Sequence, residues 1–373
     1  MHTELCDRFG IKYPIFVFTP SEKVAAAVSR AGGMGVLGCV RFNDADDLEA
    51  VLQWMDENTE GKPYGVDIVM PAKIPTEGTA VDINKLIPQE HRDFIAKTLA
   101  DLGVPPLPED EAKNEGVLGW LHSVARSHVE VALKHPIKLI ANALGSPPKD
   151  VIDQAHEHGV PVAALAGSAK HAQRHVENGV DIVVAQGHEA GGHTGEIGSV
   201  VLWPEIVDAL DGKAPVLAAG GIGTGRQVAA ALALGASGVW MGSAFLTSAE
   251  YDLGHREPGG TSTIQDALLR ASSSDTVRRK IYTGKPARLL KTKWTDAWDA
   301  EGAPDPLPMP LQNILVSEAH QRMNESDNPD TVAMPVGQIV GRMNEIRPVA
   351  DIIAELVEGF EAASRKLDTI RDS

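Results

Sequence analysis

The segment Asp181-Ile-Val-Val-Ala-Gln-Gly-His-Glu-Ala-Gly-Gly-His-Thr-Gly195 joins a short apolar run to a loop that contains four glycines and two histidines. The run has the continuous hydrophobicity of a strand that is buried on both faces. The loop is too rich in glycine for a helix or strand, and its bare positions let a flat group lie directly on the backbone. A histidine side chain ordinarily titrates near neutral pH, so His193 is expected to be able to transfer a proton there. The segment therefore predicts a pocket for a planar cofactor beside a proton-transfer residue.

Seven further apolar runs alternate with helical patterns along the chain. The predicted strands are residues 14–18, 33–40, 64–70, 137–144, 160–166, 181–185, 215–219 and 238–245. The predicted helices between them are residues 22–31, 44–56, 147–157, 169–177, 200–210 and 225–234. Because continuous apolar strands need cover on both faces, they indicate a parallel sheet. Eight of them favour an α/β fold of the closed (β/α)8 type, the TIM barrel, with a doubly wound open sheet as the alternative.

Two stretches interrupt this alternation. Residues 72–135 are proline-rich and acidic between helical patterns at 89–102 and 117–133. They predict a helical insertion after strand three, on the side where barrel active sites lie. Residues 250–373 carry helical patterns at 262–269 and 349–366 around a polar loop region at 291–310, which predicts a smaller, mainly helical C-terminal cap with a closing helix. The barrel is expected to comprise residues 1–71 and 136–249.

Charge and composition limit the partners. With 51 acidic and 34 basic residues the net charge is −17, which argues against nucleic-acid binding. The apolar runs are too short to span a membrane. The chain contains two cysteines, Cys6 and Cys39, and shows no secretory leader. Together these features predict a reduced, cytoplasmic location. We therefore expect a cytoplasmic protein with neither nucleic acid nor membrane as partner.

Two glycine-rich loops end strands seven and eight, namely Ala218-Ala-Gly-Gly-Ile-Gly-Thr-Gly-Arg226 and Met241-Gly-Ser-Ala-Phe245. In a TIM barrel these loops commonly bind phosphate through backbone amides and a helix N-terminus. A dinucleotide fingerprint counted from Gly221 fails, because its last glycine position holds Arg226. Glycines that serve only tight turns are the other alternative.

The histidines and the glutamate of the loop have different expected roles. His193 follows strand six at the carboxyl end of the barrel and is the candidate catalytic residue. His188 is either functional or an ordinary loop residue, and Glu189 is expected to brace the loop by accepting backbone N–H bonds. His171 and His175 lie four residues apart on a predicted solvated helix without a suitably spaced carboxylate or cysteine, so no metal site is predicted.

These motifs resemble the nitronate monooxygenase family, formerly called 2-nitropropane dioxygenases. The resemblance rests on Gln186 to Gly195, on Pro215 to Gly225 and on Gly238-Val-Trp-Met-Gly-Ser-Ala-Phe245. The segment Ala25-Ala-Ala-Val-Ser-Arg-Ala-Gly-Gly-Met-Gly-Val-Leu-Gly38 is similar to the family's first helix and second strand. Gly284-Lys-Pro-Ala-Arg288 and Gly337-Gln-Ile-Val-Gly341 resemble its C-terminal signatures.

The resemblance implies an FMN-dependent TIM barrel with a smaller second domain, in a family that includes flavin enoyl reductases and NADH:quinone reductases. It implies that His193 is the catalytic histidine. The cofactor-binding residues that it implies fall into three groups: Gln186, Gly191 and Gly192 along the isoalloxazine; Gly220, Gly221, Gly242 and Ser243 at the FMN phosphate; and Phe18, Thr19 and Asp67 at the flavin edge.

Two positions depart from the family pattern. The first loop reads Phe18-Thr-Pro-Ser21 where the family usually has a Pro-Met type of loop. Gly65-Val-Asp67 carries an acid where the family usually has asparagine. A carboxylate near the flavin disfavours anionic neighbours unless it is protonated or paired. Both departures affect the expected identity of the substrate more than that of the cofactor.

The resemblance implies an oxidoreductase that converts an alkyl nitronate and O₂ into a carbonyl compound and nitrite. His193 would stabilise the nitronate, or abstract the α-proton of a neutral nitroalkane. An NAD(P)H-dependent reductase of a quinone or enoyl thioester is the alternative, and a non-catalytic FMN-binding barrel is a third hypothesis. The expected partners are a small-molecule substrate and O₂, and assembly into a homo-oligomer is left open.

Overall fold

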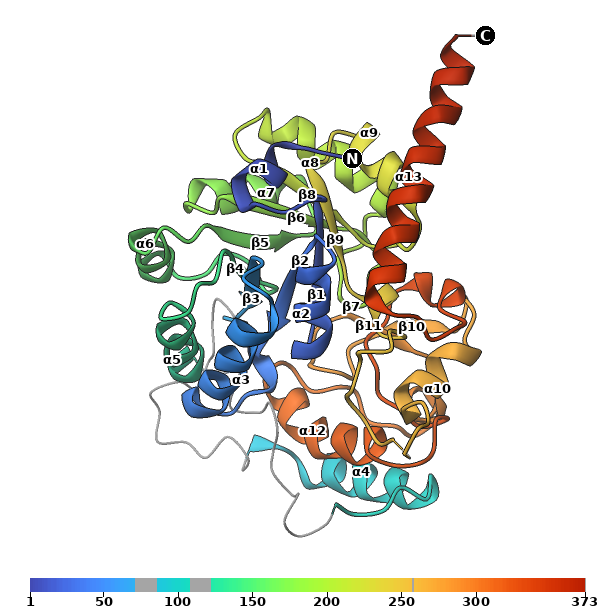
Figure 1. Ribbon diagram of the computed structural model, residues 1–373. Helices are drawn as coiled ribbons and strands as arrows, with labels where there is room; N and C mark the ends of the chain where they lie inside the picture. The colour runs from blue at the N-terminus through green and yellow to red at the C-terminus, as the bar shows by residue number, and fades with distance from the viewer. Residues whose placement is uncertain (71–85, 108–121, 257, 373) are drawn as a thin grey trace.

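The computed structural model describes residues 1–70, 86–107, 122–256 and 258–372, and its centre is a closed barrel of eight parallel strands (Figure 1). Around the barrel the strands follow in the order β1-β2-β3-β4-β5-β6-β8-β9, and β9 pairs with β1 to close the ring. The strands are β1 (Ile15–Thr19), β2 (Met34–Gly38), β3 (Tyr64–Asp67), β4 (Ile140–Asn142), β5 (Val162–Ala166), β6 (Ile182–Gln186), β8 (Val216–Ala219) and β9 (Gly238–Met241). This confirms the predicted (β/α)8 barrel.

Eight helices surround the strands. They are α2 (Glu22–Arg30), α3 (Ala45–Asn58), α5 (His122–Ala132), α6 (Lys149–Glu157), α7 (Ala169–Glu177), α8 (Ser199–Leu210), α9 (Gly225–Ala233) and α13 (Val349–Arg371). The closing helix α13 packs against α9 and α2 and so takes the place of the eighth barrel helix. A Cβ atom added at Gly225 would lie 2.2 Å from the carbonyl oxygen of Leu356, so α9 and α13 are in backbone contact. The C-terminal turns of α13 extend beyond the rest of the molecule (Figure 1).

The strand residues alternate between the barrel interior and the helical layer, as the twofold period of a strand requires. On β1, Phe16 packs inside with Met34 and Leu139, whereas Ile15 and Val17 pack outward against the helices. The short helix α1 (Glu4–Phe9) covers the amino end of the barrel, where Phe9 meets Phe16 edge to face at 5.5 Å between ring centroids. The carboxyl end of the barrel is therefore the end left for a site.

The two helices expected between strands three and four pack in different places. Helix α5 lies beside α3 in the barrel layer, and α4 (Gln89–Asp101) packs against α12 (Leu311–Asn324). The helix predicted at 117–133 is described only from residue 122, and the proline-rich stretch at 104–110 lies partly outside the described residues. The predicted domain boundaries stay a prediction.

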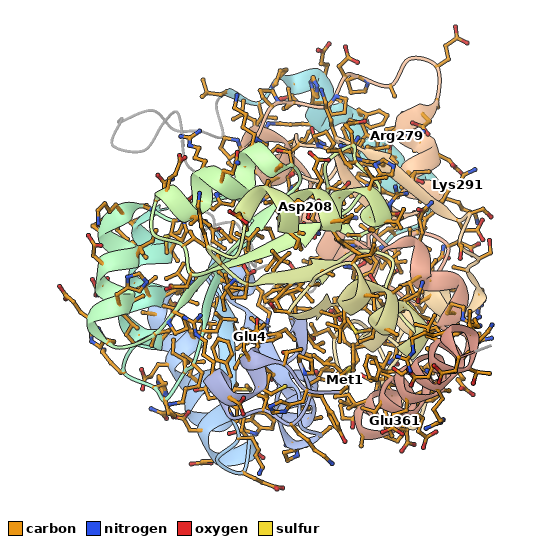
Figure 2. All side chains as sticks on the ribbon, turned by 90° about the horizontal axis from the view of Figure 1, so that it is seen from above. Met1, Glu4, Asp208, Arg279, Lys291 and Glu361 are labelled. Atoms are coloured by element: carbon orange, nitrogen blue, oxygen red, sulfur yellow. The ribbon has the colours of Figure 1, made fainter. Side chains whose placement is uncertain are left out.

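Residues 250–348, here named the cap insert, lie between β9 and α13. They contain α10 (Thr263–Arg270), α11 (Lys293–Asp299) and α12, together with β10 (Thr276–Arg279) and β11 (Ala287–Leu290). Figure 2 shows Arg279 and Lys291 on one side of the molecule, away from Glu361 of α13. The prediction of a polar loop at 291–310 is wrong for Lys293–Asp299, because these residues form α11 and bury Trp294 and Trp298. Its seven residues are too few to show a helical period.

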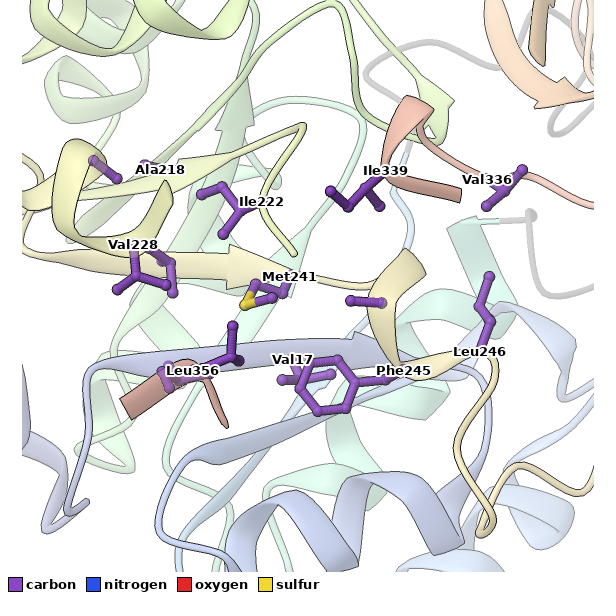
Figure 3. Packing of buried hydrophobic residues seen from close by; sticks show 14 of the residues in the cluster. Val17, Ala218, Ile222, Val228, Met241, Phe245, Leu246, Val336, Ile339 and Leu356 are labelled. Carbon is purple, nitrogen blue, oxygen red and sulfur yellow. The ribbon is translucent and has the colours of Figure 1, made fainter. Parts of the chain in front are cut away.

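The cap insert joins the barrel through a hydrophobic cluster. Figure 3 shows Ile339 of the cap insert facing Ile222 of the barrel, in the same cluster as Val336, Met241 and Phe245. A Cβ atom added at Gly223 would lie 2.3 Å from Cγ1 of Ile339, so the loop after β8 is packed directly beneath the cap insert. Within the described ranges, every helix is too short or too polar to be a candidate membrane span.

Candidate active site

The carboxyl ends of the strands bring the predicted site residues to one mouth of the barrel. Phe18, Asp67 and Gln186 occupy inward-facing positions, each two residues beyond an interior residue of its own strand. A Cβ atom added at Gly38 would lie 2.8 Å from Cε2 of Phe18, so the ring of Phe18 lies over the end of β2. The Thr19 hydroxyl instead accepts a hydrogen bond from the Ser21 backbone N–H at 3.1 Å. Thr19 is thus occupied in the local turn before α2.

The first two glycines after β8 adopt backbone conformations that favour glycine. Gly220 and Gly221 have φ values of 99° and 71°, in the left-handed region that side chains disfavour. A Cβ atom at Gly220 would lie 2.9 Å from the Ser199 hydroxyl, and one at Gly242 would lie 3.4 Å from the Phe18 carbonyl oxygen. The Ser243 hydroxyl accepts a hydrogen bond from the Gly337 N–H at 2.9 Å. The two loops, the β1 end and the cap insert therefore meet at one place.

Residues 186–195, here named the histidine loop, are held mainly by Glu189. Its carboxylate accepts hydrogen bonds from the Ser199 backbone N–H at 2.9 and 3.2 Å and from the Ser199 hydroxyl at 2.7 Å. Ser199 begins α8, where a negative charge is favourable. The bracing role predicted for Glu189 is confirmed.

A buried arginine of the cap insert clamps the same loop. The Arg288 guanidinium donates to the His188 carbonyl oxygen from two nitrogens, at 3.0 and 3.1 Å, and to the Thr276 hydroxyl at 3.0 Å. Arg288 is only 4% exposed, and burial lowers the pKa of its guanidinium. The His188 ring shares a 3.1 Å hydrogen bond between Nδ1 and the Gly195 carbonyl oxygen. This contact indicates that the His188 ring braces the loop.

His193 is positioned by strand pairing. With Gly192 it forms β7, which pairs antiparallel with β11 and sets His193 opposite Ala287. Its Nε2 lies 2.6 Å from the Thr283 hydroxyl oxygen. Burial, with a smaller effect of Lys285, lowers the pKa of the His193 imidazole to about 4. His193 is therefore neutral at pH 7 and is able to accept a proton or to donate an N–H hydrogen bond.

The two glycines before His193 face different surroundings. A Cβ atom added at Gly191 would lie 2.7 Å from the Val336 carbonyl carbon, so the cap insert packs against that position. A Cβ atom added at Gly192 would have no atom within 4 Å, and φ there is 73°. Gln186 donates from Nε2 to the Gly191 carbonyl oxygen at 3.4 Å. Gly192 is thus the bare position of this loop that borders open space.

Asp67 is the buried acid of the mouth. It is 1% exposed at the end of β3, and its Oδ1 has no hydrogen-bond partner within the described ranges. Burial raises the pKa of the Asp67 carboxyl to about 7, although an Ala143 backbone hydrogen bond partly opposes this. An unpartnered polar atom in such a position is costly unless a ligand satisfies it.

Several residues of this site were missed in the sequence. Thr283 directly precedes the Gly284-Lys-Pro-Ala-Arg288 signature and Arg288 is its last residue, while Gly337 and Gln338 open the second signature. The Gln338 N–H donates to the Glu189 carbonyl oxygen at 2.9 Å. Both signatures were recognised as motifs without a role, and their contacts with the histidine loop supply one.

The other histidines do not gather around a metal. His175 is buried rather than solvated as expected, with Nδ1 2.7 Å from the Ser146 hydroxyl and Nε2 3.1 Å from the Leu165 carbonyl oxygen. These contacts lie behind β5, where the helix packs on the sheet. In the described part of the chain no group of three or more His, Cys, Asp or Glu side chains is placed to bind a metal.

Comparison with known proteins shows the family of this chain. A family model described as nitronate monooxygenase matches residues 2–359. A Mycobacterium tuberculosis protein with monooxygenase in its name is 46% identical, and the match covers 96% of each chain. A Staphylococcus aureus protein named "Probable nitronate monooxygenase" is 28% identical over 95% of this chain and 96% of its own length.

Two solved structures are similar over nearly the whole chain. The nitroalkane oxidase of Streptomyces ansochromogenes has a TM-score of 0.77 at 25% identity, with 97% of this chain and 99% of that chain covered. FabK of Thermotoga maritima has a TM-score of 0.74 at 26% identity, with 99% of each chain covered. The barrel, the histidine loop and these matches agree, and the chain belongs to the nitronate monooxygenase family and is a flavin-dependent oxidoreductase.

Proposed function

We propose that this protein is an FMN-dependent nitronate monooxygenase that oxidises an alkyl nitronate with O₂ to a carbonyl compound and nitrite. The observation that carries the proposal is the position of His193, which β11 and Thr283 hold on a glycine loop at the barrel mouth. Burial lowers the pKa of its imidazole to about 4, which favours the neutral ring at pH 7. The family match and the similarity to a nitroalkane oxidase structure support this substrate class.

The residues present fit a planar cofactor that carries a phosphate. The open space at Gly192 and the unpartnered Oδ1 of Asp67 suit a flat ring with hydrogen-bonding atoms at its edge. Gly220, Gly221 and Gly242 are half-buried and would offer backbone N–H groups to a phosphate, as the loops after the last two barrel strands commonly do. Ser243 would add its hydroxyl as a donor. Gln186 and Phe18 would line the ring.

With FMN bound, His193, Thr283 and the cap insert would have separate roles. FMN, when bound, supplies the redox chemistry. The neutral His193 would donate an N–H hydrogen bond to a nitronate oxygen, or accept the α-proton of a neutral nitroalkane. The Thr283 hydroxyl would fix the orientation of the ring through Nε2. The cap insert, packed on the histidine loop, would exclude water from this contact.

Anaerobic mixing with a nitronate tests the proposal. Flavin bleaching is expected in the wild type and should be slowed about 100-fold or more in His193→Asn, as loss of a proton-transfer residue typically costs. His188→Asn is the matched control on the same loop, and its bleaching rate should stay within a few-fold of wild type. Equal rates in the wild type and His193→Asn would remove His193 from the mechanism.

The similarity to FabK supports a second candidate, the reduction of an enoyl thioester or a quinone by NAD(P)H. One barrel fold hosts several such chemistries. Anaerobic mixing with NADH or NADPH alone distinguishes the two candidates. Rapid bleaching by either nucleotide, with slow bleaching by a nitronate, would favour the reductase.

A further inference from the structure

Asp67 differs from the other polar side chains of the mouth because half of its carboxyl group is unsatisfied. Ser243, Thr19 and Glu189 all have hydrogen-bond partners. Asp67 receives a backbone hydrogen bond from Ala143, while its Oδ1 has no partner in the parts of the chain that the structure describes. The neighbouring Asn142 is occupied as well, because its side chain bonds both the N–H and the carbonyl of Met70. Among these residues, Asp67 is the one with a buried side-chain oxygen that has no hydrogen-bond partner in the described parts of the chain.

The surroundings of Asp67 do not support a negative charge. The side chain is 1% exposed, and no cation among the described residues offsets its charge. An unpaired carboxylate in such a place is expensive, so the group takes up a proton instead. Burial correspondingly raises the pKa of the Asp67 carboxyl to about 7.

The titratable groups around Asp67 do not change their charge in the pH range in which Asp67 does. Cys39, after β2, is fully buried, and burial together with Asp67 raises the pKa of its thiol far above the usual range. Arg41 acts on Cys39 and is ion-paired with Glu22 at 2.6 Å. Tyr64 on β3 faces outward, where its hydroxyl donates to Asp56 at 2.6 Å. Between about pH 6 and about pH 9, Asp67 is thus the group of this cluster that titrates.

We propose that Asp67 binds the flavin as a neutral carboxylic acid, which donates a hydrogen bond to an acceptor atom at the edge of the ring. This inference rests on the flavin site of the proposed function and adds a pH dependence to it. An asparagine at this position would also offer a donor but would not titrate. The acid therefore ties cofactor retention to pH, because ionisation removes the donor and places a negative charge against the ring.

Binding of FMN to the flavin-free protein tests this without reference to turnover. Quenching of flavin fluorescence gives the Kd from about pH 5.5 to about pH 9 in the wild type and in Asp67→Asn. The Kd of the wild type is expected to be constant below about pH 6 and to rise up to tenfold per pH unit above about pH 7. In Asp67→Asn this rise should disappear. Cys39→Ser is the matched control and should keep the wild-type slope.

The outcomes separate the two levels of the proposal. Parallel profiles in the wild type and Asp67→Asn, or a Kd that falls with rising pH, would overturn the neutral-acid role while leaving the flavin site in place. Failure of the wild type to bind FMN at any pH would instead overturn the proposed function. Infrared difference spectra of the wild type need no variant, and a protonated carboxyl band at pH 6 that shifts on FMN binding is expected. Absence of that band would also overturn the inference.

Discussion

Replacement of Glu189 by glutamine is expected to loosen the histidine loop without removing a proton-transfer group. The carboxylate accepts from the Ser199 N–H and hydroxyl at 2.9 and 2.7 Å. Hydrogen bonds to charged groups contribute about 1.5–3 kcal/mol each, and a charge at a helix N-terminus adds about 0.3–1 kcal/mol. Glutamine keeps one acceptor oxygen but loses the charge. The free energy of unfolding should therefore fall by about 2 kcal/mol, and flavin retention should weaken with it.

Urea unfolding and the pH dependence of turnover are the two measurements for this variant. Glu196→Gln is the control, because Glu196 lies on the adjoining segment with an 81% exposed side chain that pairs with Arg278. Such a surface ion pair contributes at most about 1 kcal/mol. A cycle with Ser199→Ala should give a coupling energy of about 1 kcal/mol or more. Unchanged stability with a shifted pH profile would refute the bracing role and make Glu189 a catalytic base.

Three further outcomes follow from the same contacts. Gly225→Ala should lower the free energy of unfolding in urea by about 3 kcal/mol, since its Cβ would lie 2.2 Å from an α13 carbonyl oxygen. Gly61→Ala is the control and should lower it by about 1 kcal/mol, because a Cβ there would meet no atom within 4 Å. The wild type should lose about 2 kcal/mol of unfolding free energy, relative to His193→Asn, between about pH 6.5 and about pH 4. The reason is that folded His193, with its pKa of about 4, binds fewer protons in this range than His193 of the unfolded chain. Equal acid profiles of the two proteins would contradict this. Arg288→Lys should cost about 2 kcal/mol, because lysine cannot donate two hydrogen bonds to the loop carbonyl in the arginine geometry, and an unchanged unfolding curve would exclude the clamp.

The barrel could be predicted because its elements are determined locally. Each strand is buried on both faces, so its hydrophobicity is continuous and visible within a few residues. The strands predicted at 33–40 and 238–245 ran too far, since the chain turns into short 3₁₀ helices at Cys39–Arg41 and Ser243–Phe245. Those turns carry the chain out of the barrel mouth, and an apolar run does not reveal where a strand bends away.

The small sheet beside the site could not be predicted in this way. Strand β7 has two residues, and it exists because Gly192 and His193 pair with Arg288 and Ala287, almost a hundred positions later. No local pattern encodes such a pairing. Glycine and histidine in the loop indicated a site, but the partners of the His193 ring and of the His188 carbonyl oxygen come from the cap insert. The two signature segments of the cap insert were the available signal, although only their contacts assign them a role.

The chain connectivity makes the cap insert part of the active site rather than an appendage. It leaves the barrel after β9 and returns through α13, which packs on α9 and α2, so both of its ends are attached to the barrel wall. Fixing both ends lowers the entropy that docking must overcome. The docked cap insert then provides β11, Thr283 and the Gly337 N–H, which reach the histidine and one glycine loop at once. Loss of cap docking would therefore displace His193 and disturb the glycine loop after β9 together, although neither lies in the cap insert.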